Sequence, residues 1–362
     1  MKDTITLAQG SGGYDSAELM KEVFAKHFAN PVLARLEDAA TVEIENAGGG
    51  AAARFAIATD TFVVKPLFFP GGDIGKLAVC GTANDVLMSG ADPRFLTCGF
   101  VLEAGLSIKR LDRICASMAE TAREAGMTIV AGDTKVIEGC GRKVSSGTNN
   151  TDESMDNEAG LLVNTTGVGV FRADAPVPLP SPSGLLPGDR LIVSGTLGDH
   201  HACILSARMG IQNGIKSDCA LLAPITHALS EAGVAAHAMR DVTRGGLATV
   251  LNELAAASSA RIEIDENAIP VDPEVHAFCG ILGLDPLTMG NEGKMVFAVS
   301  EADAAHALAA VRATVPGSRA ALIGEIYAPE PENHLPPVLR RTAIGGKARV
   351  DMLYGEGLPR IC

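Results

Sequence analysis

The sequence lacks the features that mark membrane-spanning and secreted proteins. No stretch approaches the about 18 consecutive apolar residues that a membrane-spanning helix needs. The first residues, MKDTITLAQGSGG, contain no positively charged region followed by an apolar segment, so they do not match a secretory signal. We therefore expect a cytoplasmic protein without a membrane partner.

Positively charged residues are also scarce. Lys and Arg together number 30 against 43 Asp and Glu, and the formal net charge is -13. Surfaces that bind nucleic acid need clustered cations to meet the phosphate backbone, so a nucleic-acid partner is not expected. An acidic protein can still bind an anionic small molecule if a metal ion or backbone amides supply positive charge.

Closely spaced cysteine pairs are missing as well. The eight cysteines show no C-x-x-C pair and no short spacing to histidine, which argues against a structural zinc site and a thioredoxin-like site. We expect seven of them to be reduced and mainly buried, such as Cys115 inside a helical pattern. The eighth, Cys362, is the last residue of GEGLPRIC. The backbone holds such a thiol on one side only, so we expect it to be mobile and exposed.

The apolar pattern predicts an α/β or α+β protein. At 362 residues with 47% hydrophobic residues, the chain is long enough for two domains with substantial cores. Short β-rich runs alternate with helical patterns, as in sheets that are covered by helices. The predicted strands are 55–64, 127–136, 161–171, 190–195, 294–300 and 320–326. The predicted helical segments are 74–91, 107–126, 218–233, 245–257 and 301–315.

Proline-rich stretches divide the chain. ADAPVPLPSPSGLLPGD (173–189) cannot continue a helix or a central strand, so we place the domain boundary there. APEPENHLPPVLR (328–340) separates the second domain from a C-terminal tail. The predicted domains are therefore 1–172 and 173–335, followed by the tail 336–362. The polar segment 138–160 has little to bury, and we expect a mobile loop there.

Three aspartates follow small residues in similar local settings. They are Asp60 in ATD, Asp85 in AND and Asp133 in AGD. Carboxylates at strand ends or helix starts, flanked by Ala and Gly so that phosphates can approach, are typical of magnesium–nucleotide sites. A single aspartate in such a setting is more often a turn former or a helix cap, and only the three together favour the nucleotide site.

Two glycine clusters could bind phosphate. GSGG (10–13) could present backbone amides to an anion, or it could be a flexible arm before a helix. RDVTRGGL (240–247) could be the start of a helix, where Arg244 and backbone amides could bind an anion. It could equally be a solvated loop before an ordinary helix start. No G-x-x-x-x-G-K-[ST] motif is present, so any use of ATP falls outside the P-loop class.

Each of the other polar residues in these motifs has two possible interpretations. Glu292 lies between Asn291 and Gly293 before a predicted strand, and it is either a turn residue or a general base. Lys135 follows Asp133 closely enough to share a site, although a lysine there could be simply solvated. His200 and His201 begin a helical segment without a third ligand at metal spacing, which favours surface or first-turn positions.

Taken as a set, these motifs resemble one family. GSGG, ATDTFVV, NDVLMSGA, AGDTKV, NTTGVG, SGTLGDH, RDVTRGGL, GNEGK and PRIC occur in the order seen in the HypE family of hydrogenase maturation proteins, the carbamoyl dehydratases. The resemblance covers nearly the whole chain. The PRIC ending makes it specific to that family, because the other motifs are shared with the wider PurM-like superfamily of aminoimidazole-ribonucleotide synthetases and selenophosphate synthetases.

The resemblance implies a fold and a nucleotide site. The fold is a two-domain PurM-like α/β (α+β) fold with mixed open sheets covered by helices, whose N-terminal domains pair in a homodimer. The N-terminal domain binds ATP, and Asp60, Asp85 and Asp133 resemble carboxylates that hold Mg2+ on the triphosphate. The other implied nucleotide contacts are Gly10, Ser11, Gly12, Gly13, Asn84 and Gly132.

The resemblance also implies a reaction. Cys362 receives a carbamoyl group from the carbamoyltransferase HypF, and ATP-dependent dehydration turns it into S-cyanide. The cyanide then passes to the HypC–HypD iron scaffold complex for the [NiFe]-hydrogenase centre. Glu292 is the implied base and Lys135 the group that stabilises negative charge. The tail must swing between sites, with Gly355 and Gly357 as its hinge.

Two departures and two alternatives stay open at this point. The polar segment 138–160 stands where the family has a short connection, and His201 stands where the family pattern leads us to expect glycine. One alternative is a superfamily ligase or kinase that acts on a free small molecule, for which Cys362 is incidental. The other is a non-catalytic docking protein that uses the tail to bind a partner.

Overall fold

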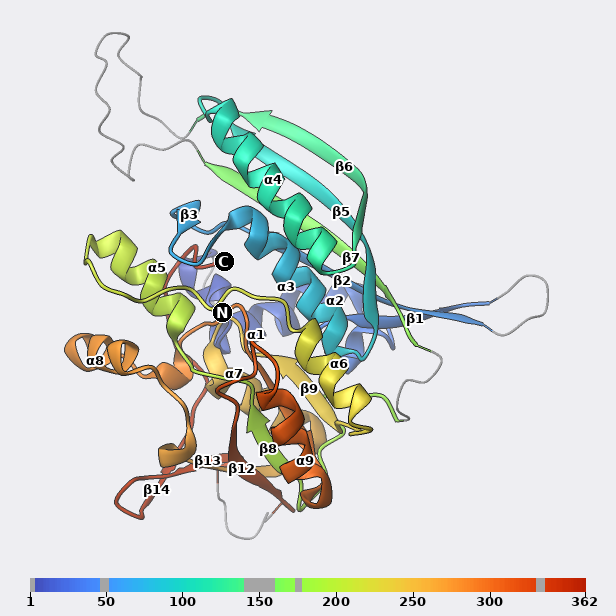
Figure 1. Cartoon of the computed structure of the whole chain (residues 1–362), viewed down its shortest axis with the longest axis vertical. Coiled ribbons are helices and arrows are strands. Elements are labelled where there is room, and N and C mark those ends of the chain that lie inside the picture. Colours follow the sequence, from blue (N-terminus) through green and yellow to red (C-terminus); the bar gives the residue numbers. More distant parts are fainter. Residues whose placement is uncertain (1–3, 46–51, 140–159, 173–177, 330–335) are drawn as a thin grey trace.

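The computed structural model describes residues 4–45, 52–139, 160–172, 178–329 and 336–362. The described chain forms two large sheets with helices packed on them, one above the other in Figure 1, and a third sheet of two short strands. Most of the predicted loop 138–160 lies outside the described residues. A two-domain α/β fold with mixed sheets is therefore confirmed.

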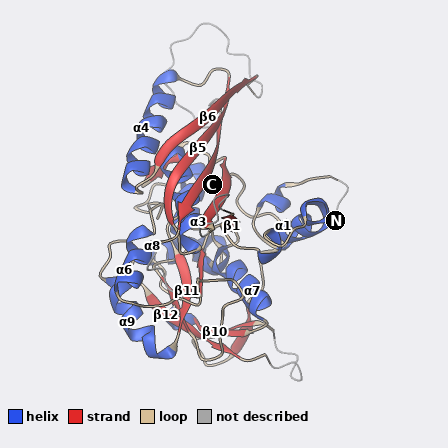
Figure 2. Ribbon diagram, turned by 90° about the vertical axis from the view of Figure 1, so that its right-hand side faces the viewer, coloured by secondary structure: helices blue, strands red, loops and turns tan. Residues whose placement is uncertain are grey.

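The first sheet is mixed and carries helices on one face. Its strand order is β1 (Ala40–Ile44), β2 (Ala53–Phe62), β7 (Leu161–Val170), β5 (Asp92–Glu103) and β6 (Thr128–Ile137). Only β5 and β6 are parallel, because α4 (Ile108–Glu124) provides the crossover that a parallel pair requires. Figure 2 shows α4 beside β5 and β6, and α3 (Ile74–Met88) packs on the same face.

Residue alternation decides which face of this sheet is covered. In β2, Ala56, Ala58 and Phe62 point to the helices and are buried, whereas Thr59 and Thr61 point away and are exposed. The core between sheet and helices includes Leu77, Leu96, Ile114, Met118, Leu161 and Val163. The opposite face of the sheet has no helix on it in the described part of the chain.

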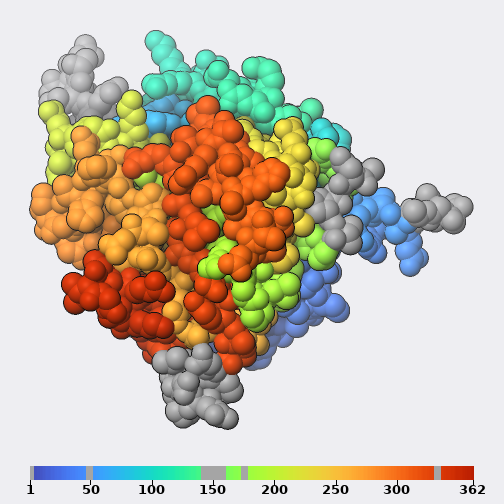
Figure 3. All heavy atoms as spheres, turned by 60° about the horizontal axis from the view of Figure 1, so that its bottom comes forward, coloured from blue at the N-terminus to red at the C-terminus, as the bar shows by residue number. Residues whose placement is uncertain are grey.

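The second sheet is covered on both faces. Its strand order is β14 (Lys347–Arg349), β13 (Val338–Arg341), β10 (Arg261–Asp265), β12 (Ala321–Tyr327), β8 (Arg190–Val193), β11 (Met295–Val299) and β9 (Ala238–Asp241). Leu191 and Val193 belong to the core with α7 (Gly246–Ser258). Ile192 belongs to the core with α6 (Ala223–Glu231) and α9 (Glu301–Arg312). Figure 3 shows the orange and red surface that the second half of the chain builds.

The remaining elements form the N-terminal arm and the connections between the elements of the two large sheets. They are η1 (Leu7–Gly10), α1 (Tyr14–Leu19), η2 (Met20–Phe24), α2 (Ala25–Phe28), η3 (Leu33–Arg35), β3 (Phe68–Phe69), β4 (Gly72–Asp73), α5 (Asp199–Met209), η5 (Glu266–Ala268), α8 (Pro273–Leu282) and η6 (Pro286–Thr288). Among the described residues, no helix combines the length and apolar character needed to cross a membrane.

Several expectations need correction. The segment 218–233 is helical only over Ala223–Glu231, and residues 218–222 form a connection without regular secondary structure. β13 and β14 complete the second sheet, so the chain leaves that sheet after residue 349 and not at residue 335. Cys115 is exposed, because it lies on the outer face of α4, whereas Ile114 and Met118 face the sheet. The strand β5 was not predicted, since proline and glycine interrupt its apolar pattern.

Candidate active site

The C-terminal tail is docked between the two domains. Cys362 is only 8% exposed, and Figure 1 places the C-terminus near β3 and α5. The N–H of Val63 donates to the carbonyl of Cys362 at 2.8 Å, and the N–H of Lys65 donates to the carbonyl of Arg360 at 3.1 Å. Nε of Arg360 donates to the carbonyl of Val63 at 2.8 Å. The tail therefore pairs with the chain that follows β2, and the expectation of an exposed thiol is wrong for this state.

Two side chains of α5 hold the tail by its backbone. Arg208 donates from Nε to the carbonyl of Lys65 at 2.6 Å and from Nη1 to the carbonyl of Pro359 at 2.5 Å, and its Nη2 donates to the carbonyl of Arg360. Nε2 of His200 lies 2.7 Å from the carbonyl of Ile361. Because these hydrogen bonds go to main-chain carbonyls, they hold the tail whatever side chains it carries.

His200 lies in the first turn of α5, which is one of the two predicted positions, but it is fully buried and not on the surface. Burial lowers its pKa, so the ring is neutral and carries one N–H. The neighbouring carbonyl of Ile361 can only accept, which assigns that proton to Nε2. Nδ1 then accepts from the hydroxyl of Ser217 at 2.7 Å.

Replacing Arg208 with alanine is expected to release the tail. Hydrogen bonds from a charged donor contribute about 1.5–3 kcal/mol each, so losing those to the tail should raise the alkylation rate of Cys362 by about tenfold or more. The matched control is Arg312→Ala, which also removes a guanidinium bond to a backbone carbonyl, that of Ala320, but in α9. Equal Cys362 alkylation rates in both variants and the wild type would contradict this role of Arg208.

The GSGG loop lies against the tail. Ser11 Oγ accepts from the N–H of Gly357 at 2.9 Å, and the N–H of Tyr14 donates to the carbonyl of Leu353 at 2.9 Å. Gly12 has a φ of +76°, and a Cβ there would come within 2.6 Å of Cβ of Arg244. Glycine is thus required because the loop packs directly on the loop that carries Arg244.

Charged groups from both domains surround Cys362. Burial raises the pKa of its thiol to about 12; Arg244 opposes this rise, whereas Glu292, Asp60 and Asp241 add to it. The guanidinium of Arg244 is itself buried among Cys362, Asp60 and Glu292, which raise its pKa. The docked thiol is therefore protonated and is a weak nucleophile near neutral pH.

This pKa predicts that alkaline conditions release the tail. The docked thiol binds its proton more tightly than a free thiol of pKa 9.0, so docking is fully favourable below about pH 9 and weakens as the pH rises toward 12. Each pH unit in that window lowers the docking constant by up to about tenfold. The test compares the alkylation rate of Cys362 with that of a free peptide ending in the same residues. A constant ratio between pH 8 and pH 11 would refute the expectation.

Glu292 lies in a buried turn beside the tail. The backbone N–H of Glu292 donates to Asp218 Oδ1 at 3.2 Å, and that of Gly293 donates to Asp218 Oδ2 at 3.1 Å. Burial raises the pKa of the Glu292 carboxyl well above its usual value, and Asp218 and Asp241 raise it further, whereas Arg244 lowers it. A carboxylate with a raised pKa is suited to accept a proton near neutral pH.

Four carboxylates converge next to this turn. The structure brings Asp60 and Asp85 together with Asp38 and Asp241, which the sequence analysis did not single out as carboxylates of the site. Burial raises the pKa of each, and charge repulsion among the four raises the pKas of Asp38, Asp85 and Asp241 further. Asp38 also pairs with Nε of Arg240 at 2.5 Å. Neither missed aspartate shares the signal of the predicted ones, since Asp38 follows Leu-Glu and Asp241 follows Met-Arg instead of small residues.

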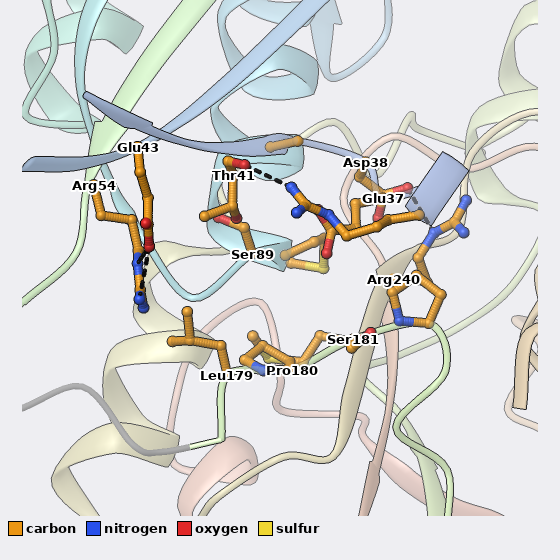
Figure 4. Close-up of a pocket in the computed structure, with 15 residues that line it drawn as sticks. Glu37, Asp38, Thr41, Glu43, Arg54, Ser89, Leu179, Pro180, Ser181 and Arg240 are labelled. Atoms are coloured by element: carbon orange, nitrogen blue, oxygen red, sulfur yellow. Dashed lines mark hydrogen bonds and ion pairs between the residues drawn. The ribbon is translucent and has the colours of Figure 1, made fainter. Parts of the chain in front are cut away.

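A polar cavity of about 270 Å³ opens beside this cluster. Figure 4 shows Asp38 pointing at Arg240 at one end of the cavity, and Arg54 paired with Glu43 at the other. Oδ2 of Asp38 has no hydrogen-bond partner. Carboxylate and guanidinium groups therefore both line this cavity, and Asp38 belongs to the cavity wall and to the carboxylate cluster.

Asn84 anchors a loop in this structure. Its Nδ2 donates to the carbonyl of Ala220 at 3.0 Å, and its Oδ1 accepts from the N–H of Leu222 at 2.9 Å. Asn84 is buried, and this pair of bonds ties the connection before α6 to α3. Its predicted contact with the nucleotide stays a prediction.

Asp133 and Lys135 lie away from the other predicted residues. They form an exposed ion pair of 2.5 Å on β6. The strand register aligns Asp133 with Gly99, Asn164 and Thr61 on the uncovered face of the sheet. The neighbouring register row, which holds Asp60, Cys98 and Gly132, points to the helices. One chain thus brings Asp60, Asp85, Glu292 and Cys362 together but not Asp133 and Lys135.

Comparison with known proteins assigns the family. Residues 36–171 match the N-terminal domain model of AIR synthase related proteins, and residues 187–333 match the C-terminal domain model. The chain is 44% identical over 365 residues to carbamoyl dehydratase HypE of Rhodobacter capsulatus, which covers 99% of this chain and 98% of that protein. It is also 44% identical to the Escherichia coli K12 carbamoyl dehydratase HypE, with 99% and 100% coverage.

Solved structures agree with this assignment. A crystal structure of HypE in complex with ATP has a TM-score of 0.76 and 42% identity, covering 99% of this chain and 100% of that one. The HypE chain of a HypE–HypF complex has a TM-score of 0.78 and 39% identity, covering 92% and 99%. The chain therefore belongs to the HypE family of carbamoyl dehydratases of hydrogenase maturation, within the AIR synthase related proteins.

Proposed function

We propose that this chain uses ATP to dehydrate an S-carbamoyl group on its own Cys362 to S-cyanide, which supplies the cyanide ligands of the [NiFe]-hydrogenase iron. The observation that carries this proposal is the docked position of Cys362, whose thiol interacts with Glu292, Arg244 and Asp60 in one buried site. A relative of 42% identity has been crystallised in complex with ATP.

The chemistry needs activation of a poor leaving group. The thiocarbamate oxygen attacks the terminal phosphorus of ATP, and the bond to the bridging oxygen breaks so that ADP leaves. The nitrogen then loses two protons while the C–O bond breaks and its electron pair leaves with inorganic phosphate. S–C≡N remains on Cys362. Glu292 accepts a proton from nitrogen, and Arg244 stabilises negative charge that develops near the sulfur.

Magnesium fits the carboxylate cluster chemically. No group of three or more His, Cys, Asp or Glu among the described residues is arranged as a finished metal site. Buried carboxylates whose pKas are raised by burial and by one another are nevertheless the oxygen donors that a hard divalent cation prefers. Asp60 and Asp85, with Asp38 and Asp241 beside them, would hold Mg2+. When bound, the ion would neutralise charge on the terminal phosphate.

Intact-mass measurement tests the proposed reaction directly. Carbamoylated protein incubated with magnesium and ATP should lose the mass of one water, and the loss should map to the C-terminal peptide that contains Cys362. Without nucleotide the carbamoyl group should persist. A loss of mass that is independent of ATP, or that maps elsewhere, would contradict the proposal.

Loading and delivery require the tail to leave this site. The docked thiol is buried, so a second protein cannot reach it there. About ten extended residues span roughly 33 Å, enough to move Cys362 to the surface. We propose the carbamoyltransferase HypF as the donor, since a relative is known in a HypE–HypF complex, and the HypC–HypD complex as the acceptor.

The uncovered face of the first sheet is the proposed homodimer surface. One register row on it holds Ile57, Val168 and Phe95, and Phe95 is 48% exposed. β6 also ends the described sheet and leaves its outer edge free. A second copy that covers this face would enclose Asp133 and Lys135, so we propose that their roles in the site depend on the paired chain.

Replacing Phe95 with glutamate is expected to convert a dimer into a monomer. Buried at a symmetric interface, the new carboxylates would be desolvated and would repel each other. Light scattering coupled to size-exclusion chromatography measures the mass. Ile281→Glu, an equally apolar exposed position on α8, is the control and should leave the mass unchanged. A dimeric Phe95→Glu variant, or a monomeric wild type, would rule out this interface.

A further inference from the structure

Residues 217–222, SDCALL, form a strap without regular secondary structure in the connection between α5 and α6. Figure 1 shows the connection from α5 to α6 crossing the middle of the molecule. The sequence pattern places this stretch in a predicted helix, so no function was attached to it. Its hydrogen bonds reach the turn that carries Glu292, the ring of His200 that contacts the tail, and the helix that carries Asp85.

The first group of contacts sets the turn that carries Glu292. The side chain of Asp218 is 2% exposed, and its two oxygens accept from the backbone N–H groups of Glu292 and Gly293 at 3.2 and 3.1 Å. Oδ2 also pairs with Nζ of Lys294 at 3.1 Å. A Cβ on Gly293 would lie 2.0 Å from the carbonyl of Asp218, so the strap and the turn are in direct backbone contact.

The second group of contacts reaches the tip of the tail. Ser217 Oγ meets Nδ1 of His200 at 2.7 Å, and Nε2 of the same ring meets the carbonyl of Ile361 at 2.7 Å. Ser217 is itself fixed, because its N–H donates to the carbonyl of Pro70 at 2.8 Å and its hydroxyl accepts from the N–H of Cys219 at 3.1 Å. The residue that supports the tail, Ser217, is therefore the direct neighbour in sequence of Asp218, which supports the turn of Glu292.

The third group fixes the far end of the strap on the first domain. Asn84 bonds to the carbonyl of Ala220 and the N–H of Leu222, one residue before the carboxylate of Asp85 in α3. The N–H of Ala220 also donates to the carbonyl of Glu292 at 3.4 Å. The strap thus rests on both domains at once and cannot move relative to one of them without breaking these bonds.

We propose that the strap is the positioning element of the dehydration reaction. Asp218 sets the turn that carries Glu292, and Ser217, acting through His200, sets the backbone of the residue before Cys362. A single short segment thereby holds the base and the thiol-bound carbamoyl group at a constant separation. This inference rests on the proposed function, in which Glu292 is the base.

The experiment compares Asp218→Asn and Ser217→Ala in the full-length protein. Dehydration is followed in the carbamoylated protein with ATP and magnesium, and alkylation of Cys362 is followed in the uncarbamoylated protein, whose thiol is free. Asp218→Asn removes the charge and one acceptor from the turn, so kcat should fall about 10- to 100-fold while KM for ATP and the alkylation rate of Cys362 stay unchanged. Ser217→Ala should raise the alkylation rate of Cys362 severalfold, and Ser217→Thr, which keeps the hydroxyl, should restore it.

Asp272→Asn is the matched control. Asp272 also accepts from a backbone N–H, that of Glu274, and pairs with Arg319, but it lies at the start of α8. It should have wild-type values for kcat, KM and alkylation. A general loss of stability would move all three quantities, whereas a positioning role moves kcat in one variant and alkylation in the other.

The outcomes separate this inference from the proposed function. A wild-type kcat for Asp218→Asn, together with a wild-type alkylation rate for Ser217→Ala, overturns the inference. If Asp218→Asn does not fold, the test rests on Ser217→Ala and Ser217→Thr. A Ser217→Thr variant whose Cys362 is alkylated as fast as in Ser217→Ala also overturns the inference. If Glu292→Gln dehydrates at the wild-type rate, Glu292 is not the base, and this conclusion does not depend on the results for the strap variants.

Discussion

Replacing Cys362 with serine should abolish formation of the S-cyanide product while ATP still binds. The hydroxyl of serine has a far higher pKa than a thiol, so it does not become the nucleophile that accepts the carbamoyl group. The change should not undock the tail, because Val63, His200 and Arg208 hold backbone carbonyls. Intact mass reports the product, and equilibrium dialysis reports bound nucleotide.

Cys115→Ser is the control for this variant. Cys115 is an exposed free thiol on α4, outside the site, so its loss should leave dehydration unchanged. The alternatives give different results. A ligase or kinase acting on a free small molecule would keep its turnover without Cys362. A docking protein would show no ATP dependence in the wild type or the variant.

Glu292→Gln should retain ATP affinity and lose dehydration by about 10²- to 10⁴-fold, the usual effect of removing a general base. Glutamine keeps the shape of the side chain. The contacts of the turn to Asp218 use backbone N–H groups, so the turn itself should persist. Single-turnover measurement on carbamoylated protein isolates the chemical step from loading of the tail.

The matched control for Glu292→Gln is Glu274→Gln. Glu274 accepts from the backbone N–H of Gly214 at an exposed position of α8, away from the tail. Its single-turnover rate should match that of the wild type. If Glu292→Gln also proceeds at that rate, the proton is taken by another group, and Glu292 is a turn residue only.

Local patterns were sufficient for much of the fold. The alternation in β2 and the 3.6-residue period of α4 placed these elements to within a few residues, because each pattern depends on neighbours close in sequence. β5 was missed, since Pro93 and Gly99 interrupt its apolar pattern and its pairing with β7 and β6 cannot be seen in the local sequence. Residues 218–222 were predicted to be helical, because composition alone does not show the hydrogen bonds to Asn84 that hold them outside a helix.

Some residues of the site were likewise predicted from local motifs, whereas others were placed only by the fold. Motifs identified Asp60, Asp85, Glu292 and Cys362, and the fold brings these four into one charged, buried region. The motif AGD made Asp133 look equivalent to Asp60. Strand register sends their side chains to opposite faces, which depends on pairing with β5 and β7 and not on local sequence.

Residue types and their order along the chain indicated the family and the chemistry of a thiol at the chain end. The acidic composition also predicted that a metal ion or backbone amides would have to supply positive charge to a bound nucleotide. The docked tail, the burial of His200 and the convergence of Asp38 and Asp241 required the folded chain. Each of these depends on contacts between residues far apart in sequence, and the free energy of such contacts comes from burial and charge in three dimensions, which no local period encodes.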